Sequence, residues 1–163
     1  MLENIDKKSI IAVMTDNPSA KGLLIAKKYG IETCVVAKTS DKQKFKDDLY
    51  KKILFYSPDL LILAGFMSIL SEKIVNDFYP NILNIHPSLL PKYKGLMTHK
   101  RMLINKEAKY GYSIHKVTKY LDDGNILSQN KKDISTVNEA KLSSNHKRLE
   151  HQRVYRDLVN LLN

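Results

Sequence analysis

Two polar side chains, Asn84 and His86, stand two residues apart at the end of the apolar run Asn81 to Ile85. On a strand, this spacing points both side chains toward the same face. An amide and an imidazole that converge on one point can hold a developing oxyanion and move a proton. A polar pair at a strand end can equally satisfy backbone groups there, and the residue types alone leave both interpretations open.

The segment after this pair has little conformational freedom. Pro87 and Pro91 each fix the backbone φ angle and remove a hydrogen-bond donor, whereas Gly95 permits a turn or a close approach. We therefore expect a rigid loop that holds Asn84 and His86 in place.

Asp122 is a third candidate, because it lies in the predicted turn Leu121 to Gly124. A carboxylate beside His86 would favour the imidazolium form, so we predict that Asp122 raises the pKa of His86 and keeps it protonated near neutral pH. Plain turn chemistry also accounts for the sequence Asp-Asp-Gly, and this alternative stays open.

His115 alternates within a predicted strand and is expected to be structural. The histidines and Cys34 do not have metal-ligand spacing.

The elements that must position these residues alternate between strands and helices. Strands are predicted at 9–15, 32–37, 60–64, 81–85, 110–118 and 126–134, and helices at 20–29, 42–56, 71–78, 98–104 and 138–162. Unbroken apolar strands between amphipathic helices predict an α/β fold with a mainly parallel sheet and helices on both faces. The helix over 42–56 is expected to bury one apolar face, made of Phe45, Leu49, Ile53 and Leu54. No repeat or linker interrupts the 163 residues, so we expect a single domain, 1–163.

The composition narrows the classes of partner. The net charge of +10 suits anionic small-molecule ligands, and the lysines are spread along the chain. Nucleic acid is not an expected partner, because no zinc-finger or aromatic RNA-binding signature occurs. The longest apolar run, Leu60 to Met67, is too short to cross a membrane, and the first residues do not form a signal peptide. With one cysteine and no disulfide framework, we expect a cytoplasmic protein. The protein is expected to be a monomer or a homodimer.

Three motifs, in this order along the chain, resemble one family of enzymes. They are LAGFMSILS at Leu63 to Ser71, NILNIHPSLLPKYKG at Asn81 to Gly95, and YSIHKVTKYLDDG at Tyr112 to Gly124. The motifs are similar to those of folate-dependent formyltransferases, most specifically the phosphoribosylglycinamide formyltransferases, or glycinamide ribonucleotide transformylases, of purine biosynthesis.

The resemblance implies a Rossmann-like formyltransferase fold and a reaction. A formyl group would pass from 10-formyltetrahydrofolate, the co-substrate, to the amine of glycinamide ribonucleotide, and the reaction would need no metal. Two alternatives are another folate-dependent N-formyltransferase, of the sugar-nucleotide type, and a non-catalytic folate-binding remnant.

The resemblance also implies roles for individual residues. His86 would donate the proton, Asn84 would help to hold the oxyanion and contact the folate, and Asp122 would support His86. The amine substrate would be contacted by Pro87 and Glu150. The folate would be contacted by Lys42, by Met67, Ser68, Ile69 and Leu70, and by Val75 as an apolar wall. Ser68 departs from the family, because many members carry arginine there.

The start of the sequence also departs from the family pattern. Family members begin with a strand and a Gly-rich Ser-Asn loop that binds the ribonucleotide phosphate at a helix N-terminus. The present sequence opens with MLENIDKK, which corresponds to the helix after that loop, so the fold is expected to be N-terminally shortened. The neighbours of the absent strand are expected to expose unpaired backbone groups. We therefore expect measurable folate binding, weak ribonucleotide binding and slow or absent turnover.

Overall fold

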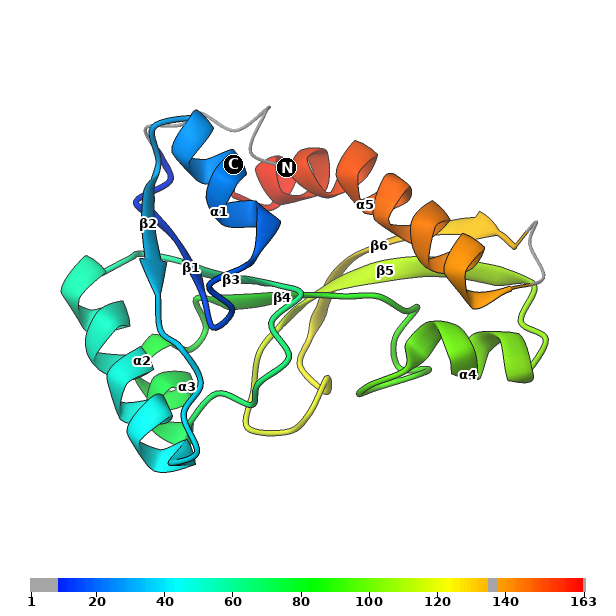
Figure 1. Cartoon of the computed structure of the whole chain (residues 1–163). Coiled ribbons are helices and arrows are strands. Elements are labelled where there is room, and N and C mark those ends of the chain that lie inside the picture. The colour runs from blue at the N-terminus through cyan, green and yellow to red at the C-terminus, as the bar shows by residue number, and fades with distance from the viewer. Residues whose placement is uncertain (1–8, 135–137, 163) are drawn as a thin grey trace. The chain divides into compact units, whose positions relative to one another are not determined.

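The computed structural model describes residues 9–134 and 138–162, in which strands and helices alternate (Figure 1). The strands are β1 (Ala12–Thr15), β2 (Glu32–Val35), β3 (Leu61–Ala64), β4 (Ile82–His86), β5 (Lys109–Lys116) and β6 (Ile126–Asp133). The helices are α1 (Lys21–Lys28), α2 (Lys42–Tyr56), α3 (Glu72–Phe78), α4 (Thr98–Ile104) and α5 (Glu139–Leu162). The helix expected at the opening residues MLENIDKK lies outside the described residues.

The elements form two compact units. The first contains the chain up to residue 59 together with 66–76, and the second contains 60–65 together with the chain from 77 onward. In the first unit β1 and β2 pair in parallel, and α1 packs against both strands. α2 begins at Asp41, whose carboxylate accepts hydrogen bonds from the backbone N–H groups of Gln43 and Lys44, each at 2.9 Å. This N-cap confirms the predicted start of the helix.

The second unit is built on a four-stranded sheet in the order β3-β4-β5-β6. β3 and β4 are parallel, whereas the pairs β4–β5 and β5–β6 are antiparallel. The alternation of strands and helices is as expected, but the antiparallel pairs correct the expectation of a mainly parallel sheet. β5 and β6 are joined by 117–125, and a parallel crossover needs about a dozen residues or more.

Two predicted details need correction. The first strand was expected from Ser9, but β1 begins at Ala12. Leu54 was expected in the core and is 48% exposed, whereas the other three residues of its predicted face are buried. Those three are spaced four residues apart and form one stripe, and Leu54 points about 100° away from it.

α5 is the longest helix, with 24 residues, and it packs against β5, β6 and α4 (Figure 1). It buries a stripe made of Leu142, His146 and Leu149. None of the helices in the described part of the chain combines the length and the apolar character that a membrane span requires.

Gly124 gives a test of the turn between β5 and β6. A Cβ atom at Gly124 would lie 1.8 Å from the carbonyl oxygen of Lys116, so the turn must shift to accept one. We predict that Gly124→Ala lowers the free energy of unfolding by about 1–3 kcal/mol, the usual cost of overpacking. Urea denaturation measures this.

Gly22→Ala is the matched control, because a Cβ on Gly22 meets nothing within 4 Å. Alanine favours a helix over glycine by roughly 1 kcal/mol, so this variant should be as stable as the wild type or more stable. If Gly124→Ala is as stable as Gly22→Ala, the backbone at Gly124 does not lie as close to the carbonyl of Lys116 as described.

Candidate active site

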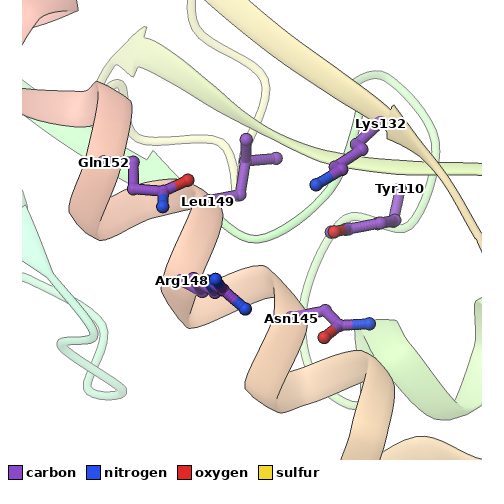
Figure 2. Close-up of a pocket in the computed structure, with 6 residues that line it drawn as sticks. All are labelled: Tyr110, Lys132, Asn145, Arg148, Leu149 and Gln152. Atoms are coloured by element: carbon purple, nitrogen blue, oxygen red, sulfur yellow. The ribbon is translucent and has the colours of Figure 1, made fainter.

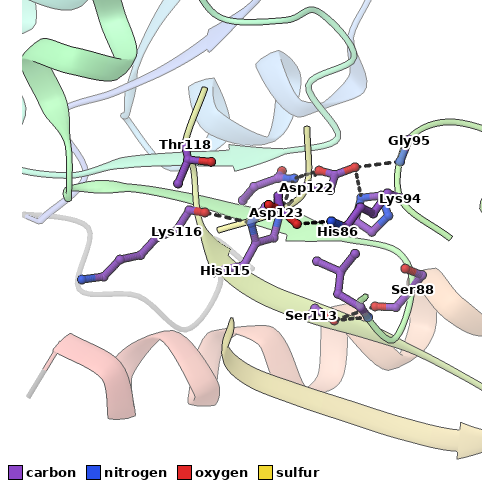
Figure 3. Close-up of polar contacts among 12 residues, drawn as sticks. His86, Ser88, Lys94, Gly95, Ser113, His115, Lys116, Thr118, Asp122 and Asp123 are labelled. Carbon is purple, nitrogen blue, oxygen red and sulfur yellow. Dashed lines mark hydrogen bonds and ion pairs between the residues drawn. The ribbon is translucent and has the colours of Figure 1, made fainter. Parts of the chain in front are cut away.

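The antiparallel register of β4 and β5 brings the predicted polar pair beside two further polar side chains. Asn84 lies opposite His115, and His86 lies opposite Ser113. The Nδ2 atom of Asn84 is 3.1 Å from Nε2 of His115. His86, Ser113 and His115 are buried, and Asn84 is half-buried, so the pair lies in a sheltered polar cluster (Figure 3).

Asp122 completes this cluster from the turn after β5. Its Oδ2 atom accepts a 2.8 Å hydrogen bond from the backbone N–H of Gly95 and lies 3.3 Å from Nδ1 of His86 (Figure 3). Its Oδ1 atom accepts a 3.3 Å hydrogen bond from Asn84 and lies 3.6 Å from Nε2 of His115. We name Asn84, His86, His115 and Asp122 the polar cluster.

Asp122 holds a left-handed backbone conformation, with a φ angle of 48°. Aspartate adopts this region more readily than most residues, but the conformation still costs on the order of 1 kcal/mol. The contacts to Gly95, Asn84 and His86 hold the residue there. Strain of this kind is concentrated at functional sites, which makes simple turn chemistry an incomplete explanation of Asp122.

The hydrogen-bond partners assign the protons of the cluster. His115 Nδ1 is 2.9 Å from the carbonyl oxygen of Lys116, and a carbonyl only accepts, so Nδ1 carries the proton. The bare Nε2 atom of His115 then accepts a hydrogen bond from Asn84. Because the other N–H of Asn84 donates to Asp122, both amide hydrogens are engaged.

The charges of the cluster follow from burial and these contacts. Burial by itself would raise the pKa of Asp122, but the contact with His115, the hydrogen bond from Gly95 and the positive charge that His86 carries in acid lower it to about 2. Asp122 is therefore a carboxylate at neutral pH.

His86 corrects one prediction. Burial lowers the pKa of His86 below its usual value, and the carbonyl of Tyr93 and the carboxylate of Asp122 offset this only in part. Asp122 acts in the predicted direction, but it does not keep His86 protonated near neutral pH, because the desolvation of the imidazolium outweighs it.

The loop after β4 is pinned to the sheet by hydrogen bonds. The hydroxyl of Ser113 donates to the carbonyl of Ser88 at 2.7 Å and accepts from the backbone N–H of Leu90 at 3.0 Å. Gln129 on β6 donates to the carbonyl of Leu90 at 2.8 Å. These contacts, beyond the two prolines, explain why the loop is held.

The far end of this loop faces His86. The carbonyl oxygen of Tyr93 is 2.9 Å from Nε2 of His86, so Nε2 carries the proton of the neutral ring. Tyr93, Gly95 and Met97 have φ angles of 60°, 77° and 57°, an alternation of left-handed residues that turns the chain sharply. Both ring nitrogens of His86 therefore face acceptors of the protein.

Apart from Asn84, which lies on β4 in the second unit, the residues predicted to contact folate belong to the first unit. Met67 and Ile69 are 69% and 74% exposed, Ser68 and Leu70 are half-buried, and Val75 is buried. Ser68 donates a 3.3 Å hydrogen bond to Asp16, which also forms a 2.9 Å ion pair with Lys38. The segment 66–70 is therefore tied to the loops after β1 and β2.

The three remaining predicted residues lie on α2, directly after β4 and on α5. Lys42 is an exposed residue at the start of α2, in the first unit. Pro87 is half-buried and directly follows His86. Glu150 lies on α5, where its Oε1 atom is 3.2 Å from Nε2 of the buried His146. His146 in turn packs against His99, so Glu150 belongs to a second histidine group and has no contact with the polar cluster among the described residues.

Sequence reasoning missed the contribution of His115 and Ser113. Both lie on β5 with the same i, i+2 spacing as Asn84 and His86 on β4, and this shared spacing was the available signal. The opposing register that joins the two pairs could not be read from either strand alone.

No group of three or more metal-ligating side chains forms among the described residues.

Asp122→Asn tests the link between the carboxylate and His86. We predict that the substitution lowers the pKa of His86 further, because it removes the negative charge that favours the imidazolium. An NMR titration of the His86 ring measures this.

Asp123→Asn is the matched control, because Asp123 is the neighbouring carboxylate and pairs with Lys94 instead. It should leave the pKa of His86 nearly unchanged. A rise of the His86 pKa in Asp122→Asn, or the same change in both variants, would contradict the pairing.

Comparisons with known proteins show which family the chain resembles. A family model described as formyl transferase matches residues 2–158. Phosphoribosylglycinamide formyltransferase of Escherichia coli (strain K12) is 42% identical over 127 residues, which are 77% of this chain and 60% of that protein. The protein of the same name in Haemophilus influenzae is 36% identical over 124 residues, 75% of this chain and 58% of its own length. The chain thus spans about three-fifths of these curated relatives.

The fold is similar as well. The crystal structure of phosphoribosylglycinamide formyltransferase from Anaplasma phagocytophilum matches with a TM-score of 0.83 at 34% identity, covering 93% of this chain and 76% of that one. This likeness confirms the formyltransferase fold that the motifs implied. With the family match extending over nearly the whole sequence, the chain belongs to the formyl transferase family.

Proposed function

We propose that the protein transfers a formyl group from 10-formyltetrahydrofolate to the primary amine of glycinamide ribonucleotide, a step of purine biosynthesis. The observation that carries the proposal is the polar cluster. A buried carboxylate, two imidazoles and an amide meet beside the end of β4, in a chain of the formyl transferase family. Such a set can move protons and stabilise a developing negative charge.

His86 acts as a proton shuttle in this proposal. The lowered pKa leaves the ring neutral at rest, so it can accept the proton that the attacking amine loses. Asp122, at 3.3 Å from Nδ1, then stabilises the imidazolium, which donates the proton to the departing nitrogen. The proton count is unchanged over the cycle. Before this step His86 must give up its contact with the Tyr93 carbonyl and move its proton from Nε2 to Nδ1, where Asp122 can accept it in a hydrogen bond, so that the bare Nε2 faces the substrate.

Asn84 supplies the donor for the developing oxyanion. Its N–H to Asp122 spans 3.3 Å and is the longer of its two hydrogen bonds, so it is the easier one to redirect. His115 keeps hold of the other N–H and fixes the plane of the amide. In this role His115 is a positioning residue, because it acts through Asn84.

The folate portion is assigned to the first unit by the family resemblance. The exposed apolar side chains of Met67 and Ile69 suit the flat face of a heterocycle, and Lys42 supplies a positive charge suited to a folate carboxylate. The co-substrate supplies the formyl group itself. Val75 is buried, so it supports such a surface from beneath, and Ser68 is engaged with Asp16.

Pro87 and Glu150 are proposed contacts of the amine substrate, on the family resemblance. Pro87 follows His86 directly and is suited to this role. Glu150 would have to leave His146, which lies 3.2 Å away, to reach a ligand. The cytoplasmic location, the monomeric or homodimeric state and the metal-free reaction stay predictions.

A single-turnover assay tests the proposal. The protein, in excess, is mixed with 10-formyltetrahydrofolate and a high concentration of glycinamide ribonucleotide, and formylated product is measured. We predict that His86→Ala slows the transfer by about 10²–10⁴-fold, as expected for loss of an acid–base group, while folate binding is nearly unchanged. His99→Ala is the control, because His99 is a half-buried histidine outside the polar cluster.

The outcomes separate the candidate functions. Transfer to an amino-sugar nucleotide and not to glycinamide ribonucleotide would indicate the sugar-nucleotide type of formyltransferase. Folate binding without transfer to either amine would indicate a binding protein. An unchanged rate in His86→Ala would show that the polar cluster is not catalytic.

A further inference from the structure

A cavity of about 120 Å³ lies between α5 and the strands β5 and β6, in the second unit (Figure 2). None of its lining residues belongs to the polar cluster. The lining is made of Tyr110, Lys132, Asn145, Arg148, Leu149 and Gln152.

Regular secondary structure explains why these side chains meet. Tyr110 and Lys132 are directly opposite each other in the register of β5 and β6, so both point to the same face of the sheet. The four helical residues follow the spacing i, i+3, i+4 and i+7, which is one stripe of α5. The cavity is therefore lined by rigid elements on both sides.

The lining is rich in hydrogen-bond donors and carries positive charge. Lys132 and Arg148 are cations at neutral pH, and neither forms an ion pair within the described residues. Burial raises the pKa of Tyr110, and although the charge of Arg148 opposes this, the hydroxyl keeps its proton. The amides of Asn145 and Gln152 add further donors, and the lining contains no carboxylate.

The side chains converge from the two sides. Figure 2 shows the ammonium of Lys132 and the hydroxyl of Tyr110 extending from the strands toward α5, and the guanidinium of Arg148 extending from the helix. Leu149 is buried and forms the apolar part of the lining. Two exposed cations that form no ion pair within the described residues thus lie beside the buried Tyr110, an arrangement suited to a small anion with several oxygens.

We propose that this cavity binds a phosphate group, held by Lys132, Arg148 and Tyr110. The planar guanidinium of Arg148 on one side and the ammonium of Lys132 on the other can donate to different oxygens of a tetrahedral anion. Each of these hydrogen bonds would be strengthened by charge. The proposal goes beyond formyl transfer, since it concerns a separate site, and it stands or falls independently of catalysis at His86.

The test is a titration of the full chain with inorganic phosphate at constant ionic strength, followed by amide NMR shifts of Tyr110, Lys132 and Arg148. Saturable shifts at these amides are expected in the wild type. The double variant Lys132→Gln with Arg148→Gln should weaken binding by about tenfold or more, because charge-assisted hydrogen bonds are lost. Tyr110→Phe keeps the ring and should weaken it by a smaller factor.

The matched control removes two positive charges from the same elements at positions that do not line the cavity. It combines Lys131→Gln on β6 with Lys147→Gln on α5, and should change the affinity by about twofold or less, because neither side chain lines the cavity and their charges act on the anion only through solvent. Absence of saturable shifts in the wild type, or equal weakening in the two double variants, would overturn the proposal.

Discussion

The carboxylate of Asp122 is the interaction on which the candidate site depends. One oxygen accepts the N–H of Gly95 and faces His86, and the other accepts the N–H of Asn84 and lies near His115. A buried carboxylate is unfavourable unless hydrogen bonds and opposite charge surround it, and these contacts bring the pKa of Asp122 to about 2. The same contacts connect the loop after β4, the strand β5 and the turn that follows it.

The surrounding fold serves to hold this charge in place. The antiparallel register of β4 and β5 sets Asn84 opposite His115. One amide hydrogen of Asn84 therefore points to His115 and the other to Asp122. Ser113 anchors the loop whose far end offers the Tyr93 carbonyl to His86. Gly124 allows the turn to pass close to Lys116, so that Asp122 reaches the cluster. A resting His86 that is neutral, with Asp122 ready to stabilise its charged form, suits a proton shuttle better than a permanent acid.

Much of this could be predicted from the sequence, because local patterns report local structure. Apolar runs and the Asp41 cap indicated the strands and α2, and the pair Asn84 and His86 indicated a polar site at a strand end. The antiparallel half of the sheet, the role of His115 and the protonation of His86 could not be predicted in this way. Each depends on which strands lie side by side, or on a balance between burial and charge that only the folded packing sets.

The central claim is that Asp122 organises a cluster with fixed proton positions. Long-range ¹⁵N–¹H NMR of the histidine rings at neutral pH tests it most directly, because it shows which nitrogen of each ring carries the proton. The structure predicts a proton on Nδ1 of His115, with Nε2 bare and accepting from Asn84, and a proton on Nε2 of a neutral His86. A proton on Nε2 of His115 would contradict the account, because Asn84 could not then donate to both His115 and Asp122.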